Sequence, residues 1–188
     1  LERFVLVDDT WASLLAGRTS VEEVVELFGR LAPDERDTSV WRRIASALGE
    51  LRRLAGADHL ATIEQLVARL ARPVLDELDG AIDANGSGGH EAAEDDGTAR
   101  CRELRGVVFS LAGRDGGDTE VRERARGLVL DDDDPALRAA ATDVVAASAT
   151  AEEHQELERR WRAATTPQEE LRLLNALIDT PDPECFAH

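Results

Sequence analysis

Apolar residues recur at intervals of three and four along nearly the whole chain, and this spacing favours helices that share buried faces. In the first stretch the apolar positions are Phe4, Val7, Trp11, Leu14 and Leu15. Gly17 stands where the first helix is expected to end. A second stripe, which Pro33 terminates, contains Val21, Val24, Val25, Phe28 and Leu31. Helices joined by so short a turn run roughly antiparallel, so the sequence predicts an αα-hairpin over residues 1–31.

Residues that stop and start helices separate the later stripes. A third helix is expected from about Thr38 to Ala55, with Gly56 at its end. Asp58 is expected to cap the next helix, in which Pro73 should cause a kink or a restart. The stripes of these helices contain Trp41, Ile44, Ala45, Leu48, Leu51 and Ala55, then Leu60, Ile63, Val67 and Leu70.

Three residue pairs have the spacing of a capping box, in which each side chain binds the other residue's backbone N–H. The pairs are Ser20 with Glu23, Thr150 with Glu153, and Thr166 with Glu169. Each pair predicts the beginning of a helix. Asp182 and Pro183 similarly suggest the start of a further helix near the end of the sequence.

The composition changes between Asp79 and Gly97, where the regularly spaced apolar residues give way to glycine, alanine and acidic residues. Such a composition is typical of a mobile acidic loop, which we expect at about residues 79–97. Neither flanking half has an obvious separate core. The sequence therefore predicts one domain over residues 1–188.

Two later segments share the pattern D-x-x-Φ-R-x-x-A, where Φ is apolar; one begins at Asp118 and the other at Asp134. In each, the aspartate can cap a helix, the apolar residues can face inward, and the arginine can lie at the rim. The pattern is typical of HEAT-type helical arrays. Tyrosine is absent and aromatic residues make up only 4% of the chain, which also favours helices over strands. We predict an all-α fold: a HEAT/armadillo-like array of antiparallel helix pairs, a bowl-like α-solenoid that is truncated at both ends.

The net charge of −17 argues against nucleic acid and anionic membranes as partners, because both require a basic face. No apolar run approaches the roughly 20 residues needed to span a bilayer. Cys101 and Cys185 lack C-x-x-C spacing and are expected to be reduced thiols of a cytoplasmic protein, although a disulfide between them stays possible.

The sequence His90-Glu91-Ala92-Ala93-Glu94 is the nearest approach to a zinc motif. A helical zinc site of the H-E-x-x-H type needs a second histidine where this chain has Glu94, and the glycine-rich surroundings are also wrong. His59, His154 and His188 have no partner at ligand spacing. The sequence therefore predicts no metal, cofactor-binding or catalytic residue in this chain.

Other charged and aromatic residues have structural interpretations. The acidic run Asp131–Asp134 lacks the glycine and distal glutamate of a calcium loop, so it is expected to be a helix-capping turn. The three tryptophans lie on helical stripes and are expected in the core. The arginine-rich positions are expected to form local i, i+4 pairs with acids on solvent faces: Arg42, Arg43, Arg52, Arg53, Arg122, Arg124, Arg126, Arg159 and Arg160.

Several residues resemble a known helical domain, the C-terminal domain of the aminopeptidase N-like (gluzincin) zinc metallo-aminopeptidases, which include the endoplasmic-reticulum aminopeptidases. In the first hairpin these residues are Arg3, Leu6, Asp8, Asp9, Trp11, Leu14, Ala16, Gly17, Ser20 and Leu27. Two later places support the resemblance: Leu104-Arg105, and the turn Ala164–Glu169 with Leu173, Ala176 and Leu177 beyond it. The acidic pair Asp8-Asp9 lies beside an apolar stripe, so we expect it to contact a neighbouring helix or another domain.

The resemblance implies a non-catalytic domain that caps the active site of a larger enzyme and helps control peptide access. Zinc is then expected in a separate catalytic domain of the same polypeptide, and peptides are the expected substrates. The acidic surface would favour basic peptides. Two alternatives stay open: a free-standing HEAT-like scaffold that binds a protein partner, and a metal-dependent enzyme that uses His90.

Overall fold

The computed structural model describes residues 1–86, 96–129 and 134–180, and all regular structure within these ranges is helical. The α-helices are α1 (Glu2–Leu15), α2 (Val21–Leu31), α3 (Thr38–Leu54), α4 (Leu60–Gly86), α5 (Asp96–Ser110), α6 (Thr119–Leu128), α7 (Pro135–Ala146), α8 (Ala151–Ala163) and α9 (Pro167–Ile178). Two 3₁₀ turns, η1 (Ala32–Asp34) and η2 (Ala57–His59), and a π-helical turn, η3 (Leu111–Asp115), join some of them. The all-α prediction is confirmed.

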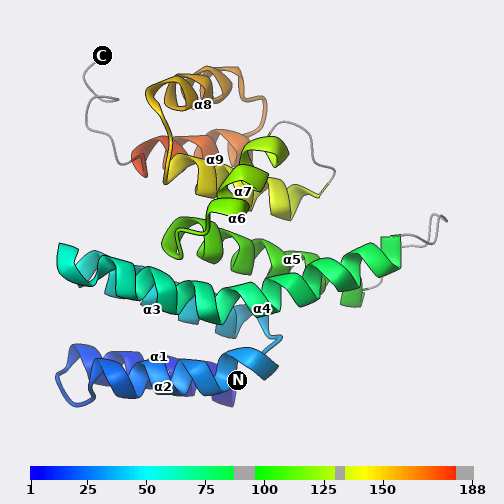
Figure 1. Cartoon of the computed structure of the whole chain (residues 1–188). Helices are drawn as coiled ribbons and strands as arrows, with labels where there is room; N and C mark the ends of the chain where they lie inside the picture. Colours follow the sequence, from blue (N-terminus) through cyan, green and yellow to red (C-terminus); the bar gives the residue numbers. More distant parts are fainter. Residues whose placement is uncertain (87–95, 130–133, 181–188) are drawn as a thin grey trace.

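The helices are stacked in layers from one end of the molecule to the other (Figure 1). The α1–α2 hairpin forms one end and the α8–α9 pair lies toward the other. Each odd-numbered helix from α1 to α7 also packs against the next odd-numbered helix. As a result α3, α5 and α7 are adjacent, although other helices separate them in the sequence.

Short-range polar contacts begin most of these helices. Ser20 and Thr150 form complete capping boxes with Glu23 and Glu153, as predicted. Thr166 caps α9 through the backbone N–H of Glu169, but no return bond from the glutamate side chain is present. The predicted aspartate caps of α6 and α7 are confirmed, because Asp118 and Asp134 each accept two backbone N–H groups. The prediction for Asp58 is wrong: this residue lies inside η2, whose N-cap is Gly56.

Helix α4 is longer than the sequence suggests. It continues through Pro73 without a restart and is bent in Figure 1. It also continues to Gly86, and α5 begins at Asp96, so both ends of the loop expected at 79–97 are helical. Residues 87–95 in its middle lie outside the described residues, as do Asp182 and Pro183. Asp79 is therefore a residue of a helix and not of a loop.

The buried apolar side chains form two clusters. The larger extends from Val7 in α1 to Val145 in α7, and the smaller joins Ala146, Leu157, Leu173, Ala176 and Leu177. Trp11 and Trp41 are buried, as expected, and each indole N–H donates a hydrogen bond, to Glu50 and to the Glu35 carbonyl respectively. Trp161 is only partly buried, against the smaller cluster.

None of the described helices is both long and apolar enough to cross a membrane.

Candidate functional site: a polar cleft between α3, α5 and α7

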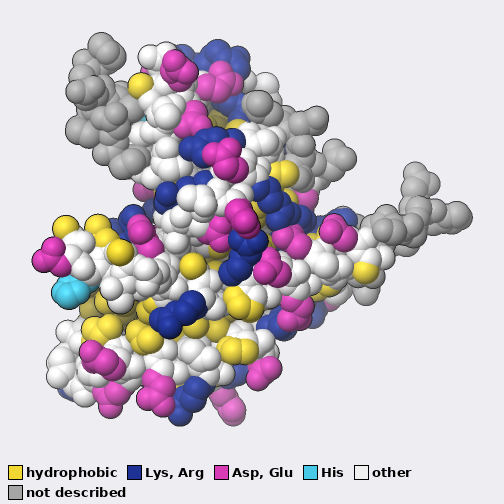
Figure 2. All heavy atoms as spheres, viewed as in Figure 1, with side chains coloured by type: hydrophobic (Ala, Val, Ile, Leu, Met, Phe, Trp, Pro, Cys, Tyr) yellow, Lys and Arg dark blue, Asp and Glu magenta, His cyan; other side chains and the backbone are white. Residues whose placement is uncertain are grey.

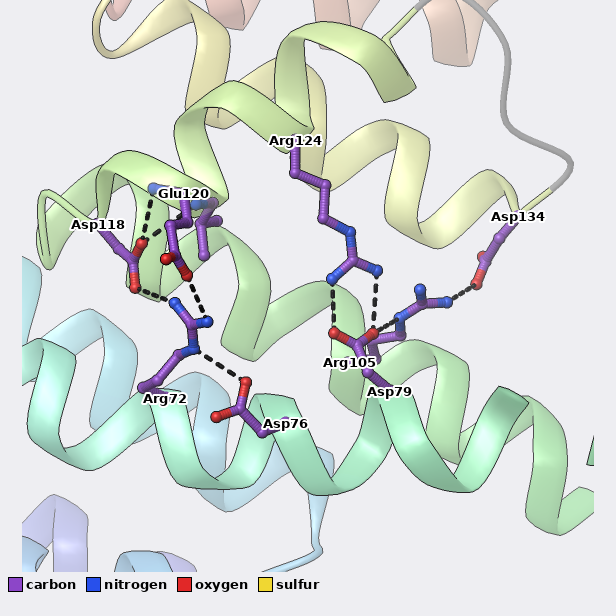
Figure 3. Close-up of polar contacts among 9 residues, drawn as sticks. Arg72, Asp76, Asp79, Arg105, Asp118, Glu120, Arg124 and Asp134 are labelled. Atoms are coloured by element: carbon purple, nitrogen blue, oxygen red, sulfur yellow. Dashed lines mark hydrogen bonds and ion pairs between the residues drawn. The ribbon is translucent and has the colours of Figure 1, made fainter. Parts of the chain in front are cut away.

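A network of ion pairs joins α4 to α5, α6 and α7 (Figure 3). Asp79 of α4 accepts hydrogen bonds from Arg105 at 2.7 Å and from Arg124 at 2.5 and 3.0 Å. Arg105 also lies 3.7 Å from Asp134, and the Arg124 guanidinium stacks over the Phe109 ring. Burial tends to raise the pKa of Asp79, but the hydrogen bonds and charge of Arg124, followed by those of Arg105, outweigh it and lower this pKa.

A second node of the same network is Arg72, about two helical turns earlier on α4 (Figure 3). Its guanidinium binds Glu120 at 2.6 Å, Asp118 at 2.9 Å and Asp76 at 2.9 Å. Hydrogen bonds to these three carboxylates, that to Glu120 first, raise the pKa of Arg72. Because the charges in both nodes pair with one another, we interpret the network as a clamp between helices and not as a ligand site.

The arginines that the sequence places on helix faces pair mainly between helices. The prediction of local i, i+4 pairs holds for Arg160, which lies 3.8 Å from Glu156, and approximately for Arg159, which binds the same carboxylate at i, i+3. It is wrong for four pairs that join separate helices: Arg42–Glu103, Arg43–Asp8, Arg52–Glu64 and Arg124–Asp79. Arg126 pairs both locally with Glu123, at i, i+3, and with Glu153 of another helix. The Asp8–Arg43 contact confirms that the acidic pair of α1 reaches a neighbouring helix.

A cleft of about 470 Å³ lies between α3, α5 and α7 and extends to η3. Small residues leave this space open, because Gly49, Gly106 and three alanines of α7 provide no long side chain to fill it. Those alanines are Ala136, Ala139 and Ala140. The volume falls in the range of ordinary small-molecule sites.

Charged side chains of both signs line the cleft. Two of the cationic groups are neutralised: Arg42 pairs with Glu103 at 2.7 Å and Arg114 pairs with Asp179 at 3.0 Å. The other charged residues of the lining are Arg53, Asp115 and Asp143, and none of them forms an ion pair within the part of the chain that the structure describes.

Asp115 of η3 and Asp143 of α7 are partly buried carboxylates in this cleft. Within the described parts of the chain, neither carboxylate accepts a hydrogen bond or forms an ion pair. Burial raises the pKa of Asp115, and it raises the pKa of Asp143 to about 6, against the opposing charge of Arg114. Desolvated carboxylates in a cavity are typical of binding and catalytic sites, so this cleft is the candidate functional site.

A second hollow, of about 750 Å³ and mainly apolar, separates the α1–α2 hairpin from α3 and α4. Figure 2 shows hydrophobic side chains gathered between these two layers. Leu15 and Leu54 line it and are 60% and 71% exposed. Most of its lining residues are apolar, and we therefore interpret it as a packing surface and not as a site of chemistry.

The histidines and cysteines of the sequence do not converge. His59 is exposed, and the buried His154 has Nδ1 3.0 Å from the Thr180 hydroxyl. Cys101 is a partly buried free thiol. Three residues considered in the sequence lie outside the described ranges: His90, Cys185 and His188. Within residues 1–86, 96–129 and 134–180, no group of three or more histidine, cysteine or acidic side chains is placed to hold a metal ion.

Sequence reasoning missed Asp115 and Asp143 because neither has a motif. Asp115 follows the apolar positions of α5 and η3 that end at Leu111 and Ala112, and Asp143 lies in α7 between the buried residues Thr142 and Val144. One feature of the sequence could have identified Asp143: it directly precedes Val144, in a stretch of α7 that consists mainly of alanine and valine. An acid at such a position must be desolvated if the stretch is buried.

The fold and the cleft together define a helical-array domain, with small-residue gaps between its helices and no metal-binding cluster among the residues described. The comparison with protein families gives a more particular result. The family described as "ERAP1-like C-terminal domain" matches residues 1–188, and the chain belongs to this family of aminopeptidase C-terminal domains. No curated protein sequence and no solved structure matches the chain.

Proposed function

We propose that this domain caps the active site of a zinc-dependent aminopeptidase and helps control which peptides reach it. The observation that carries the proposal is the family match over residues 1–188, since the family consists of C-terminal domains of ERAP1-like aminopeptidases. The proposal assigns zinc and catalysis to a separate domain of the same polypeptide. It also treats residues 1–188 as a single HEAT-like domain of a cytoplasmic protein.

The packing of the helices supports a role as a stiff cover. Ion pairs between helices join α1 to α3, α3 to α5, and α4 to α5 and α6. Because these contacts cross between layers, they resist sliding of one helix past its neighbour. A cover that restricts access needs this resistance, since a wall that deforms freely would admit any peptide.

The acidic character of the chain supports peptides as the ligands of the assembled enzyme. With a net charge of −17, the domain repels polyanions and attracts basic peptides at low ionic strength. The proposal therefore includes a preference for basic over acidic peptides of equal length, and this preference should weaken as salt is added.

The test compares the full-length enzyme with a variant that ends before Leu1. An aminoacyl-anilide and a nine-residue peptide serve as short and long substrates, and zinc content shows whether the catalytic part is intact. We expect zinc and anilide hydrolysis to be retained, while the ratio of kcat/KM for the peptide to that for the anilide changes at least tenfold. An unchanged ratio would contradict the proposed capping role.

Two further observations apply to the chain itself. The 188-residue chain alone should not hydrolyse aminoacyl-anilides, and zinc-dependent turnover by it would contradict the assignment of catalysis to another domain. The reading frame upstream of Leu1 should encode H-E-x-x-H with a downstream glutamate. Its absence would instead favour a free-standing scaffold.

A further inference from the structure

The polar cleft contains groups of opposite charge that border the same space without pairing. A methyl group placed on Gly49 of α3 would lie 3.6 Å from Asp115 Oδ1 and 3.7 Å from Arg53 Nη1. No ion pair joins Asp115 to Arg53, and within the described residues neither side chain has another hydrogen-bonding partner. The Cα hydrogen of Gly49 therefore faces a space that is bordered by a carboxylate and a guanidinium, which do not bind each other.

Asp143 adds a second negative charge on another wall of the same cleft. The charge of Arg114 acts on both aspartates, but Asp179 already binds this arginine. Arg114 therefore cannot fully neutralise the two carboxylates. Burial of a carboxylate without a partner is costly. Both aspartates would therefore favour the binding of an external cation in the cleft.

The floor of the cleft between these charges is apolar. Ala139 and Ala140 of α7 line the cleft together with Val107 and Leu111, and none of these four side chains carries a polar atom. An aliphatic group could therefore be buried there without loss of a hydrogen bond. The cleft presents negative charge, positive charge and an apolar surface within one space of about 470 Å³.

We propose that this cleft binds a free α-amino acid with an aliphatic side chain. The ammonium group binds Asp115 and is further stabilised by Asp143, the carboxylate binds Arg53, and the side chain lies over the alanines of α7. A simple cation would leave Arg53 facing the ligand without a partner, and a simple anion would be repelled by both aspartates. The proposal concerns this chain alone and does not depend on the function of the parent enzyme.

The first test is a titration of the uniformly ¹⁵N-labelled 188-residue chain, followed by backbone amide shifts. Three matched probes are used: L-leucine, 3-methylbutylamine, which lacks the carboxylate, and 4-methylpentanoate, which lacks the ammonium group. We expect saturable shifts with L-leucine at amides of η3, α7 and the end of α3. The Kd of each of the other two probes should be at least tenfold higher.

Two outcomes of the titration would overturn the proposal. If 3-methylbutylamine binds as tightly as L-leucine, Arg53 does not take part and the ligand is only a cation. If no probe gives saturable shifts at these amides, the cleft is not an amino-acid site. If the amide shifts are confined to residues of the apolar hollow between the first hairpin and α4, the polar cleft is likewise not an amino-acid site.

The second test uses variants in which binding and stability are expected to change in opposite directions. Gly49→Ala should raise the thermal midpoint, because alanine is the better residue inside a helix and its methyl group meets only ordinary contacts. The same methyl group occupies the gap, so the Kd for L-leucine should rise at least tenfold. Gly29→Ala in α2 is the matched control, since nothing lies within 4 Å of the added methyl group; it should leave the Kd unchanged.

Asp143→Asn tests the carboxylate in the same way. It removes an unpartnered charge, so it should not destabilise the fold, yet it should weaken L-leucine binding at least tenfold. The exposed Asp9 of α1, replaced by asparagine, controls for the change in net charge. Equal affinity in wild type, Gly49→Ala and Asp143→Asn would overturn the proposal.

Discussion

Replacement of Asp79 by alanine should be far more costly than replacement of Asp76, three residues earlier on the same helix. Asp79 binds two arginines from different helices, and its side chain is only 22% exposed. Its loss leaves Arg105, which is 11% exposed, with Asp134 at 3.7 Å as the remaining charge partner in Figure 3. Removal of one partner of a buried pair costs about 3–5 kcal/mol, and the residual contact places the expected loss near the lower figure, about 3 kcal/mol.

Asp76 is the matched control because it pairs with Arg72 at the surface, where its side chain is 59% exposed. Arg72 retains Asp118 and Glu120 when Asp76 is removed. Exposed pairs of this kind contribute at most about 1 kcal/mol, so Asp76→Ala should lower the free energy of unfolding by about 0.5 kcal/mol or less. Urea unfolding at pH 7.5, followed by far-UV circular dichroism, measures both variants under the same conditions.

The pH dependence provides an independent check. The pKa of Asp79 is lowered in the folded state, so its contribution is fully present above the unfolded-state pKa of about 3.9. It is lost as the pH falls through the lower folded-state pKa. The difference between wild type and Asp79→Ala should therefore be constant from pH 7.5 to pH 5 and shrink below about pH 4. Equal losses for Asp79→Ala and Asp76→Ala would refute the interpretation of Asp79 as a buried node.

Three further predictions concern packing, capping and the candidate site. Gly113→Ala places a methyl group 2.6 Å from Val144 Cγ1 in the core, so urea unfolding should show a loss of about 2 kcal/mol, whereas Gly127→Ala, with nothing within 4 Å, should be neutral or stabilising; equal effects would show that the core adapts. Thr150→Ala removes the cap of α8 and should cost about 1 kcal/mol, with Thr150→Ser restoring most of it. Because the pKa of Asp143 is raised to about 6, its ionised form destabilises the fold at neutral pH, and Asp143→Asn should gain at most about 3 kcal/mol at pH 7.5. That gain should fall to about half at pH 5, where the folded wild type is protonated; a gain independent of pH would show that ionisation is not its cause.

Much of the helical architecture could be predicted from the sequence because helix ends depend on residues a few positions apart. Ser20, Thr150, Asp118 and Asp134 cap the helices expected of them, and Gly17 ends α1 with a φ of 69°. The buried stripes follow from the same short-range spacing. The family resemblance was likewise carried by local patterns, chiefly those of the first hairpin, and the family match over residues 1–188 confirms it.

The predictions that failed concern positions whose environment comes from elsewhere in the chain. The composition around Asp79 suggested a loop, yet Arg105 and Arg124 bind this carboxylate in a helix. Asp58 has the right type and position for a cap, but the chain forms a 3₁₀ turn there instead. Local propensity is a weak preference, and contacts between helices override it where they differ.

What the sequence alone determined is therefore the helical content, most helix ends and the family. The tertiary structure decided which charges meet. Asp79 and Asp115 are both acids at helical positions, but the first is neutralised by arginines from two helices and the second faces a cleft without a partner. The difference arises because the packing of α3, α5 and α7 depends on residues far apart in sequence, and electrostatic free energy depends on distance and burial in space.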